Sequence, residues 1–96
     1  MQRFTVRILP DVQSTLRHLP PMLKMQIRQA LEELGSDPYV GKPLQRQLKG
    51  LYSYRVSRYR IVYRIRRQEI LVEVIDIAAR SLVYARVAEW LTKVRR

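Results

Sequence analysis

The sequence predicts one α+β domain over residues 1–96. A mostly antiparallel four-stranded sheet should carry an N-terminal helical hairpin on one face and be followed by a C-terminal helix. Three observations support this fold. A length of 96 residues suits a single domain. Apolar residues alternate with polar residues in four segments, as in half-buried strands, and recur at helical spacing in three others. The order of these segments is strand, two helices, three strands, helix (β-α-α-β-β-β-α).

The N-terminal part is predicted to form a strand and two helices. Arg3 to Leu9 alternates apolar and polar side chains, which is typical of a strand. Pro10 suits the first turn of a short helix, and Pro20-Pro21 ends that helix and begins the next. Gly35 is a natural stop for the second helix. The apolar stripe of this second helix consists of Leu23, Ile27, Leu31 and Leu34.

The rest of the chain is predicted as a loop, three strands and a helix. Residues 36–50 hold several prolines and glycines and form the loop. The strands are Leu51–Val56, Tyr59–Arg66 and Ile70–Ala78, and the short gaps between them favour an antiparallel meander. Ser81 to about Val94 carries an apolar stripe at helical spacing. Arg95 and Arg96 would then lie near the negative end of this helix dipole.

The basic composition restricts the class of partner. The sequence contains 19 Lys and Arg residues against 8 Asp and Glu residues, for a formal net charge of +11, and 15 of the 19 are arginines. Arginine grips phosphate with a planar, forked set of donors, whereas lysine acts as a point charge. This composition predicts a polyanionic partner, which could be nucleic acid, an anionic membrane surface or an acidic protein.

The composition also indicates a location. The chain has no cysteine, which excludes thiolate metal sites and favours a reducing, cytoplasmic environment. Met1 to Pro10 contains no apolar run long enough for a signal peptide, and no stretch approaches the length of a membrane span. We therefore expect a cytoplasmic protein with no membrane partner.

Two arginines are predicted to face each other across the central hairpin. If residues 57–58 form a two-residue turn, Arg55 lies opposite Arg60 on one face of the sheet. Like charges in this arrangement destabilise a sheet, so a bound anion such as a backbone phosphate would offset the cost. The alternative is a solvated outer face on which these arginines pair with Asp76 or Glu73. The opposite face should hold the core residues Tyr54, Val56, Tyr59, Ile61, Tyr63 and Ile65.

Arg80 and Tyr84 form a second candidate pair. They would be neighbours one turn apart on the last helix. Arginine could stabilise charge on a phosphate, and tyrosine could stack on a base or move a proton. The alternative is that Tyr84 packs in the core with only its hydroxyl at the surface.

The remaining side chains narrow the chemistry. His18 is the single histidine, and the chain has neither a Gly-rich phosphate loop nor a Ser-His-Asp set. We therefore expect no metal and no cofactor. An enzyme of this composition would work through Arg, Lys and Tyr, which favours charge stabilisation of a phosphoryl transfer.

Three segments resemble the RelE/ParE toxin superfamily. They are GKPLQRQLKGLYSYRV, beginning at Gly41, then RYRIVYRI, then VEVIDIAARSLVY. The resemblance extends over nearly the whole chain and implies the toxin of a type II toxin–antitoxin module. RelE-like members cleave messenger RNA on the ribosome without metal, by attack of the RNA 2′-hydroxyl on the adjacent phosphate. The partners implied are a cognate antitoxin, the ribosome and messenger RNA.

The resemblance also implies roles for individual residues. Arg60 and Arg80 match arginines that stabilise the phosphate charge, and Tyr84 matches a tyrosine that packs on the substrate base or assists proton transfer. Arg55 matches one of two basic positions on the preceding strand. The side chains expected to hold nucleic acid are Lys42, Arg46, Lys49, Arg58 and Arg64.

The sequence departs from the RelE pattern at three positions. Ser53 occupies the second basic position of the strand, Ala79 stands where many members have His, and Ser81 where many have a second Arg. The general base is therefore unassigned. Two alternatives follow: a ParE-like inhibitor of DNA gyrase, acting through the last helix, and an inactive relative that only binds nucleic acid.

Overall fold

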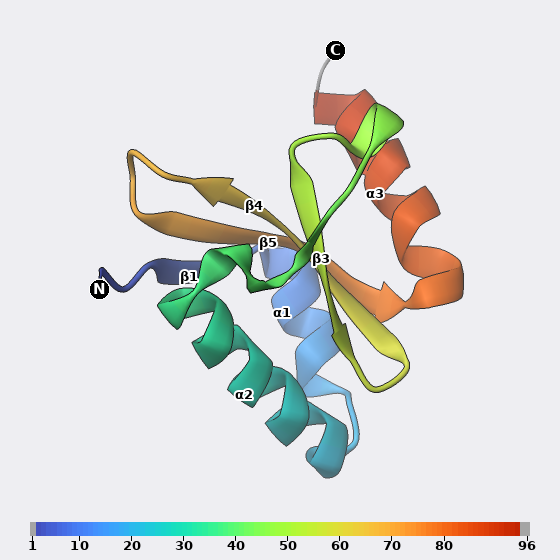
Figure 1. Ribbon diagram of the computed structural model, residues 1–96. Helices are drawn as coiled ribbons and strands as arrows, with labels where there is room; N and C mark the ends of the chain where they lie inside the picture. Colours follow the sequence, from blue (N-terminus) through green and yellow to red (C-terminus); the bar gives the residue numbers. More distant parts are fainter. Residues whose placement is uncertain (1, 95–96) are drawn as a thin grey trace.

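The computed structural model describes residues 2–94 and consists of a curved sheet with helices on both faces (Figure 1). Arg95 and Arg96 lie outside the described residues. The elements in chain order are β1 (Thr5–Ile8), α1 (Pro10–Arg17), α2 (Pro21–Ser36), the 3₁₀ helix η1 (Pro38–Val40), β2 (Lys42–Pro43), the 3₁₀ helix η2 (Arg46–Leu48), β3 (Leu51–Val56), β4 (Tyr59–Arg66), β5 (Leu71–Ala79) and α3 (Arg80–Val94). Among these, no helix is both long enough and apolar enough to cross a membrane.

The sheet has five strands in the order β1-β5-β4-β3-β2. β1 pairs with β5 in parallel, and the other neighbours are antiparallel. The α+β class and the mostly antiparallel sheet are confirmed, but the predicted count of four strands is wrong. The additional strand, β2, is only two residues long and lies inside the segment predicted as a loop. A strand of two residues has no alternation to detect, so periodicity could not reveal it.

A close contact between the loop and the sheet holds β2 in place. The Gly41 amide donates a hydrogen bond of 3.1 Å to the hydroxyl of Tyr63 on β4. That hydroxyl donates in turn to the Pro38 carbonyl at 2.7 Å. A Cβ on residue 41 would lie 2.3 Å from the Tyr63 hydroxyl, so only glycine permits this approach.

The register of the central hairpin is the predicted one. Val56 pairs with Tyr59 and Arg55 pairs with Arg60, which leaves residues 57–58 as the turn. Ser57 adopts a φ of 56°, in the left-handed region, although the turn lacks the Asn-Gly pair that usually favours it. The side chains of Arg55 and Arg60 therefore share one face of the sheet.

The pairing of β4 with β5 contains a bulge. β5 has one extra residue, Ile75, opposite the step from residue 62 to residue 63 of β4. Because of this bulge, Arg64 pairs with Glu73, and the next residue of β5, Val74, falls on the other face. The bulge thus determines which charged side chains meet across these strands.

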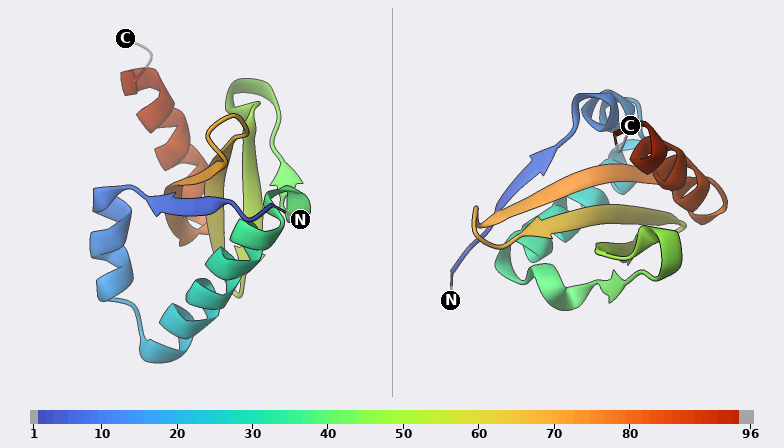
Figure 2. Two further views of the ribbon diagram at one scale, coloured as in Figure 1. Left: turned by 90° about the vertical axis from the view of Figure 1, so that its left-hand side faces the viewer. Right: turned by 90° about the horizontal axis from the view of Figure 1, so that it is seen from above.

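Helices cover both faces of the sheet and enclose two cores. The face under α1 and α2 includes all six predicted core residues, buried or packed against the cluster. α3 lies on the face opposite to α2, as Figure 2 shows in the view from above. We call this second surface the α3 face. The core residues of the α3 face are Leu51, Val62, Ile75, Ala78, Val83, Val87 and Leu91.

Candidate functional site

Arg55 and Arg60 lie side by side on the α3 face without a carboxylate partner in residues 2–94. Arg55 Nε donates to the Ser57 carbonyl at 3.3 Å, and Arg60 Nη1 donates to the Tyr59 carbonyl at 3.2 Å. The two nearby carboxylates, Glu73 and Asp76, bind other arginines. The alternative in which these carboxylates neutralise Arg55 and Arg60 is therefore wrong. Two arginines at opposed positions of β3 and β4 therefore keep free guanidinium donors, which an anion bound between them would use.

Arg80 lies at the same end of the sheet. Arg60 pairs with Ala78, and Arg80 follows two residues later, as the first residue of α3. Figure 1 shows the tip of the β3–β4 hairpin and the junction of β5 with α3 close together. The positive end of the α3 dipole adds to the charge of these arginines. The Arg58 side chain, in the hairpin turn, is exposed at this end.

Tyr84 connects α3 to the strand that carries Arg55. Its hydroxyl lies 3.0 Å from the Ser53 hydroxyl, and Ser53 is only 7% exposed. The ring packs against the core of the α3 face. The ring therefore packs against the core, as the second interpretation predicts, and its hydroxyl is held by Ser53 instead of lying free at the surface.

The loop contributes basic side chains of two kinds. Lys42 lies in β2 directly opposite Ser53, so it is on the α3 face. Arg46 lies in η2 and Lys49 follows it, and both are exposed. The structure thus brings Lys42 to the neighbourhood of Tyr84, whereas the other two basic residues stay with the η2 segment.

Arg64 belongs to a different group of charges. Its guanidinium donates to the Glu73 carboxylate, which also binds Arg7 at 3.0 Å and Arg66 at 3.3 Å. We call Arg7, Arg64, Arg66 and Glu73 the Glu73 cluster. Burial alone would raise the pKa of Glu73, but the hydrogen bonds and charges of the arginines lower it to about 2. Arg64 also lies over the ring of Trp90, 5.8 Å from its centroid. The structure thus places Arg64 apart from the other predicted site residues.

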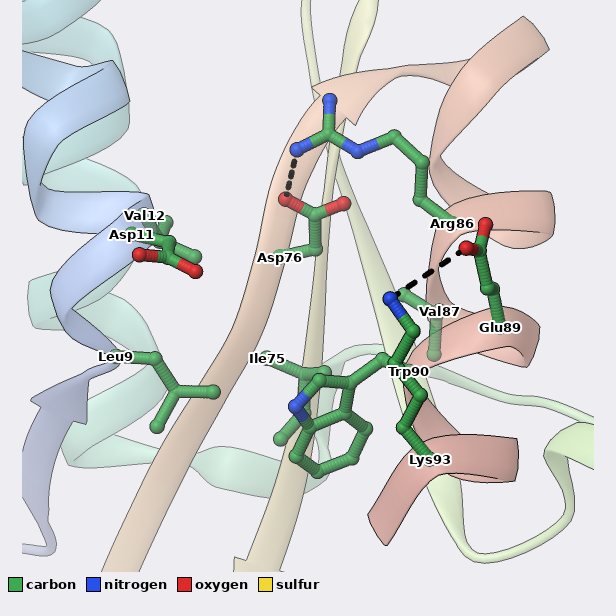
Figure 3. A pocket seen from close by; sticks show the side chains of 10 residues that line it. All are labelled: Leu9, Asp11, Val12, Ile75, Asp76, Arg86, Val87, Glu89, Trp90 and Lys93. Carbon is green, nitrogen blue, oxygen red and sulfur yellow. Dashed lines mark hydrogen bonds and ion pairs between the residues drawn. The ribbon is translucent and has the colours of Figure 1, made fainter.

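A pocket of about 290 Å³ between α1 and α3 is a feature that sequence reasoning missed (Figure 3). Arg86 of α3 binds Asp76 of β5 at 3.0 Å within it. Burial raises the pKa of Asp76, and the Arg86 charge and the Ile77 amide oppose this only in part. None of the predicted site residues lines this pocket. Its position depends on the packing of two helices far apart in sequence, which no local pattern reveals.

No metal site is evident in the part of the chain that the structure describes. Residues 2–94 contain no group of three His, Cys, Asp or Glu side chains placed to hold an ion. At the end of the α3 face where Arg55, Arg60 and Lys42 lie, the polar side chains are guanidinium, ammonium and hydroxyl groups. Such a set can bind a phosphate, stabilise negative charge on it and exchange protons with it.

Comparisons with known proteins agree on one family. A family model described as the ParE toxin of type II toxin–antitoxin systems, parDE, matches residues 3–84. The toxin RelG of Mycobacterium tuberculosis is 35% identical over 85 residues, which cover 86% of this chain and 98% of RelG. The toxin RelE of the same organism is 49% identical over 45 residues, covering 47% of this chain and 46% of that protein.

Solved structures show the same fold. The RelBE2 toxin–antitoxin complex of Mycobacterium tuberculosis contains a chain with a TM-score of 0.75 and 32% identity, which covers 84% of this chain and 95% of that one. A mutant of the Escherichia coli toxin RelE in the free state gives a TM-score of 0.73 at 19% identity, with 91% and 94% covered.

Proposed function

The chain belongs to the RelE/ParE superfamily of type II toxin–antitoxin toxins, and on this premise we propose that it is an endoribonuclease that cleaves messenger RNA on the ribosome. The observation that carries the proposal is the pair of unneutralised arginines, Arg55 and Arg60, at the end of the sheet where Arg80 begins α3. Guanidiniums held on a rigid sheet are suited to stabilising the charge that develops on a phosphate.

The proposed reaction needs no metal ion or cofactor. The RNA 2′-oxygen attacks the adjacent phosphorus, and the bond from phosphorus to the 5′-oxygen breaks, leaving a 2′,3′-cyclic phosphate and a 5′-hydroxyl. Arg60 and Arg80 stabilise the negative charge on the phosphate oxygens, and Arg55 holds the phosphate in place. The RNA backbone also contacts Lys42 and Arg58 at this end, and Arg46 and Lys49 on the η2 segment, so binding weakens steeply with salt.

Tyr84 positions the substrate in this proposal. Its half-buried ring has a fixed orientation because it packs against the α3-face core and its hydroxyl is bonded to Ser53. The exposed part of the ring contacts a base next to the cleaved bond.

A cognate antitoxin is the protein partner that we propose. Several similar structures are toxin–antitoxin complexes, including the Mycobacterium tuberculosis RelBE2 complex and an Escherichia coli RelBE complex. A net charge of +11 favours an antitoxin whose toxin-binding segment is acidic. Binding over the arginines would block access of RNA to the α3 face.

Gyrase inhibition is the second candidate, because the matching family model is that of the ParE toxin. Expression of the chain alone in a bacterial host, followed by primer extension on abundant messages, separates the two. We expect discrete cuts within translated regions that vanish when translation initiation is blocked. A DNA-damage response without cuts would refute the ribonuclease proposal in favour of gyrase. RNA binding without growth arrest would select the inactive relative.

A further inference from the structure

The general acid of this reaction can be assigned from the strand that the sequence did not reveal. We propose that Lys42, on β2, donates the proton to the departing 5′-oxygen, an assignment that rests on the proposed ribonuclease function. The leaving oxygen carries away an electron pair when its bond to phosphorus breaks, so a nearby proton donor lowers the barrier.

The register of β2 places Lys42 beside the arginine-bearing surface. Lys42 pairs with Ser53, and directly opposed residues of an antiparallel pair have Cβ atoms about 4.5–5.5 Å apart on the same face. Ser53 is the residue that holds the Tyr84 hydroxyl, and Arg55 is two residues further along the same face of β3. The flexible four-carbon stem of lysine therefore brings its ammonium group within reach of a phosphate bound to these arginines.

The other lysines are used or placed elsewhere. Lys24 of α2 donates to the Arg17 carbonyl, and Lys93 pairs with Glu89 at 3.6 Å. Lys49 follows η2. Lys42 is exposed and forms no ion pair with any carboxylate of residues 2–94. It is thus the one lysine among the described residues that lies on a strand of the α3 face.

Lysine supplies what the arginines cannot. A guanidinium holds its protons too tightly to transfer one, whereas an ammonium group can give up a proton and be recharged. In the proposed step the 5′-oxygen takes a proton from the Lys42 ammonium, and the proton of the 2′-hydroxyl passes to water. The neutral Lys42 amine then recovers a proton from water, so the cycle is balanced.

This assignment explains the serine at position 53. The resemblance to RelE-like toxins predicts a second basic residue at that position of the strand. Here Ser53 instead orients Tyr84, and the neighbouring strand β2 delivers a basic side chain to the same part of the face. The basic side chain at this part of the face thus comes from Lys42 on β2, whereas the RelE-like pattern places it on the strand that corresponds to β3.

The test compares two substitutions of Lys42 in the purified full-length chain, with programmed ribosomes and a message that contains one cleavage site. K42A and K42R should both lose about 10²-fold or more in cleavage rate, because arginine keeps the charge but cannot donate a proton. The control is K24A, which removes a lysine from the opposite face and should retain the parent rate. A K42R variant with the parent rate would show a purely electrostatic contact and overturn the proposal.

A second substrate makes the test specific to proton donation. When sulfur replaces the 5′-bridging oxygen, the leaving group needs no proton, so K42A should cleave this linkage about as fast as the parent. The R60A variant should stay impaired on it, because phosphate charge still develops. Failure of the sulfur linkage to rescue K42A would overturn the assignment.

The substitution S53K in the K42A background gives an independent check. It returns a lysine to the same face one strand away, and we expect it to recover part of the lost rate. Because S53K also removes the hydrogen bond to Tyr84, the reference is S53A in the same K42A background, and no recovery relative to that folded variant would overturn the assignment. A parent protein that cuts no message on ribosomes would instead refute the ribonuclease function itself, and with it the reaction in which Lys42 acts.

Discussion

Two groups of arginines lie on the α3 face, near opposite ends of β4, and they differ in one respect. Arg55 and Arg60 have no carboxylate partner within residues 2–94, whereas the arginines of the Glu73 cluster share a buried carboxylate. The nearest members of the two groups, Arg60 and Arg64, are four positions apart on β4, which is about 13 Å of extended chain. Arg64 also has its guanidinium bound to Glu73, so it is not free to join Arg55 and Arg60 around one phosphate.

The difference indicates that the two groups have different tasks. Glu73 joins β1 to β4 through Arg7 and Arg64, so the cluster strengthens the parallel edge of the sheet. Arg55 and Arg60 form no ion pair that links strands within residues 2–94, and their charges repel each other across β3 and β4. Arginines with a carboxylate stabilise the fold, and arginines without one are available for a ligand. Substitutions at the two ends should therefore separate activity from stability.

The largest expected effect is that of R60A on cleavage. We expect a loss of about 10²–10³-fold in the rate on programmed ribosomes, as for removal of one group that stabilises transition-state charge. The melting temperature should stay the same or rise slightly, since the repulsion from Arg55 is relieved. The matched control is R28A, which removes an exposed arginine of α2 and should leave cleavage unchanged. Full activity of R60A would show that the arginines without a carboxylate partner are not needed for cleavage.

The substitution E73Q should lower the stability of the fold and leave the cleavage rate nearly unchanged, which is the reverse of the result expected for R60A. Removing the charge from a buried group that accepts from three arginines should lower the free energy of unfolding by about 1–3 kcal/mol. Urea unfolding followed by circular dichroism measures this change. The folded variant should cleave at close to the parent rate. The control is E69Q, which alters an exposed partner of Arg66 and should cost at most about 0.5 kcal/mol.

The contribution of the Glu73 cluster to stability should also depend on pH. The pKa of Glu73 is about 2 in the folded chain, below its ordinary value of 4.5, so the unfolded chain binds a proton more readily. The stabilisation from Glu73 is therefore complete above about pH 4.5 and is lost progressively as the pH falls toward 2. Urea midpoints at several pH values in this window should fall less steeply for E73Q than for the parent. Equal slopes would show that Glu73 is not ion-paired in solution.

The smallest expected effect is that of S53A. Loss of one neutral hydrogen bond to Tyr84 is worth about 0.5–1.5 kcal/mol, which corresponds to a 2- to 10-fold lower kcat/KM if Tyr84 must be oriented. In a Y84F background, which lacks the hydroxyl, the same substitution should have little further effect. An equal loss in both backgrounds would mean that Ser53 acts independently of Tyr84.

The central hairpin was the part of the site most open to prediction. Alternating side chains in two adjacent segments determine which residues share a face, so the pairing of Arg55 with Arg60 followed directly. The position of Arg64 did not follow, because the bulge at Ile75 brings Glu73 opposite it. An unbulged register would have put Val74 there. The bulge changes the phase of the alternation, so that Val74 and Ile77 face the same core, but the pairing partner of Arg64 depends on where in β5 the extra residue is inserted.

β2 was also missed from the sequence, because it depends on contacts between residues that are far apart in the chain. β2 forms because the Gly41 amide and the Pro38 carbonyl meet the Tyr63 hydroxyl, which is a contact between residues more than 20 positions apart. Nothing local in residues 36–50 predicts it. Lys42 was predicted from the sequence as a candidate for nucleic-acid binding, but only the strand pairing places it opposite Ser53.

The approach of Gly41 to Tyr63 gives the toxin an unusual point of vulnerability. Even one added methyl group at position 41 would push the loop off the sheet and carry the neighbouring lysine with it, while both hydrophobic cores stayed whole. Cells that escape poisoning should therefore accumulate changes in a residue that has no functional group of its own. Sequencing of survivors from a randomly mutated library would show whether Gly41 is among the positions most often replaced.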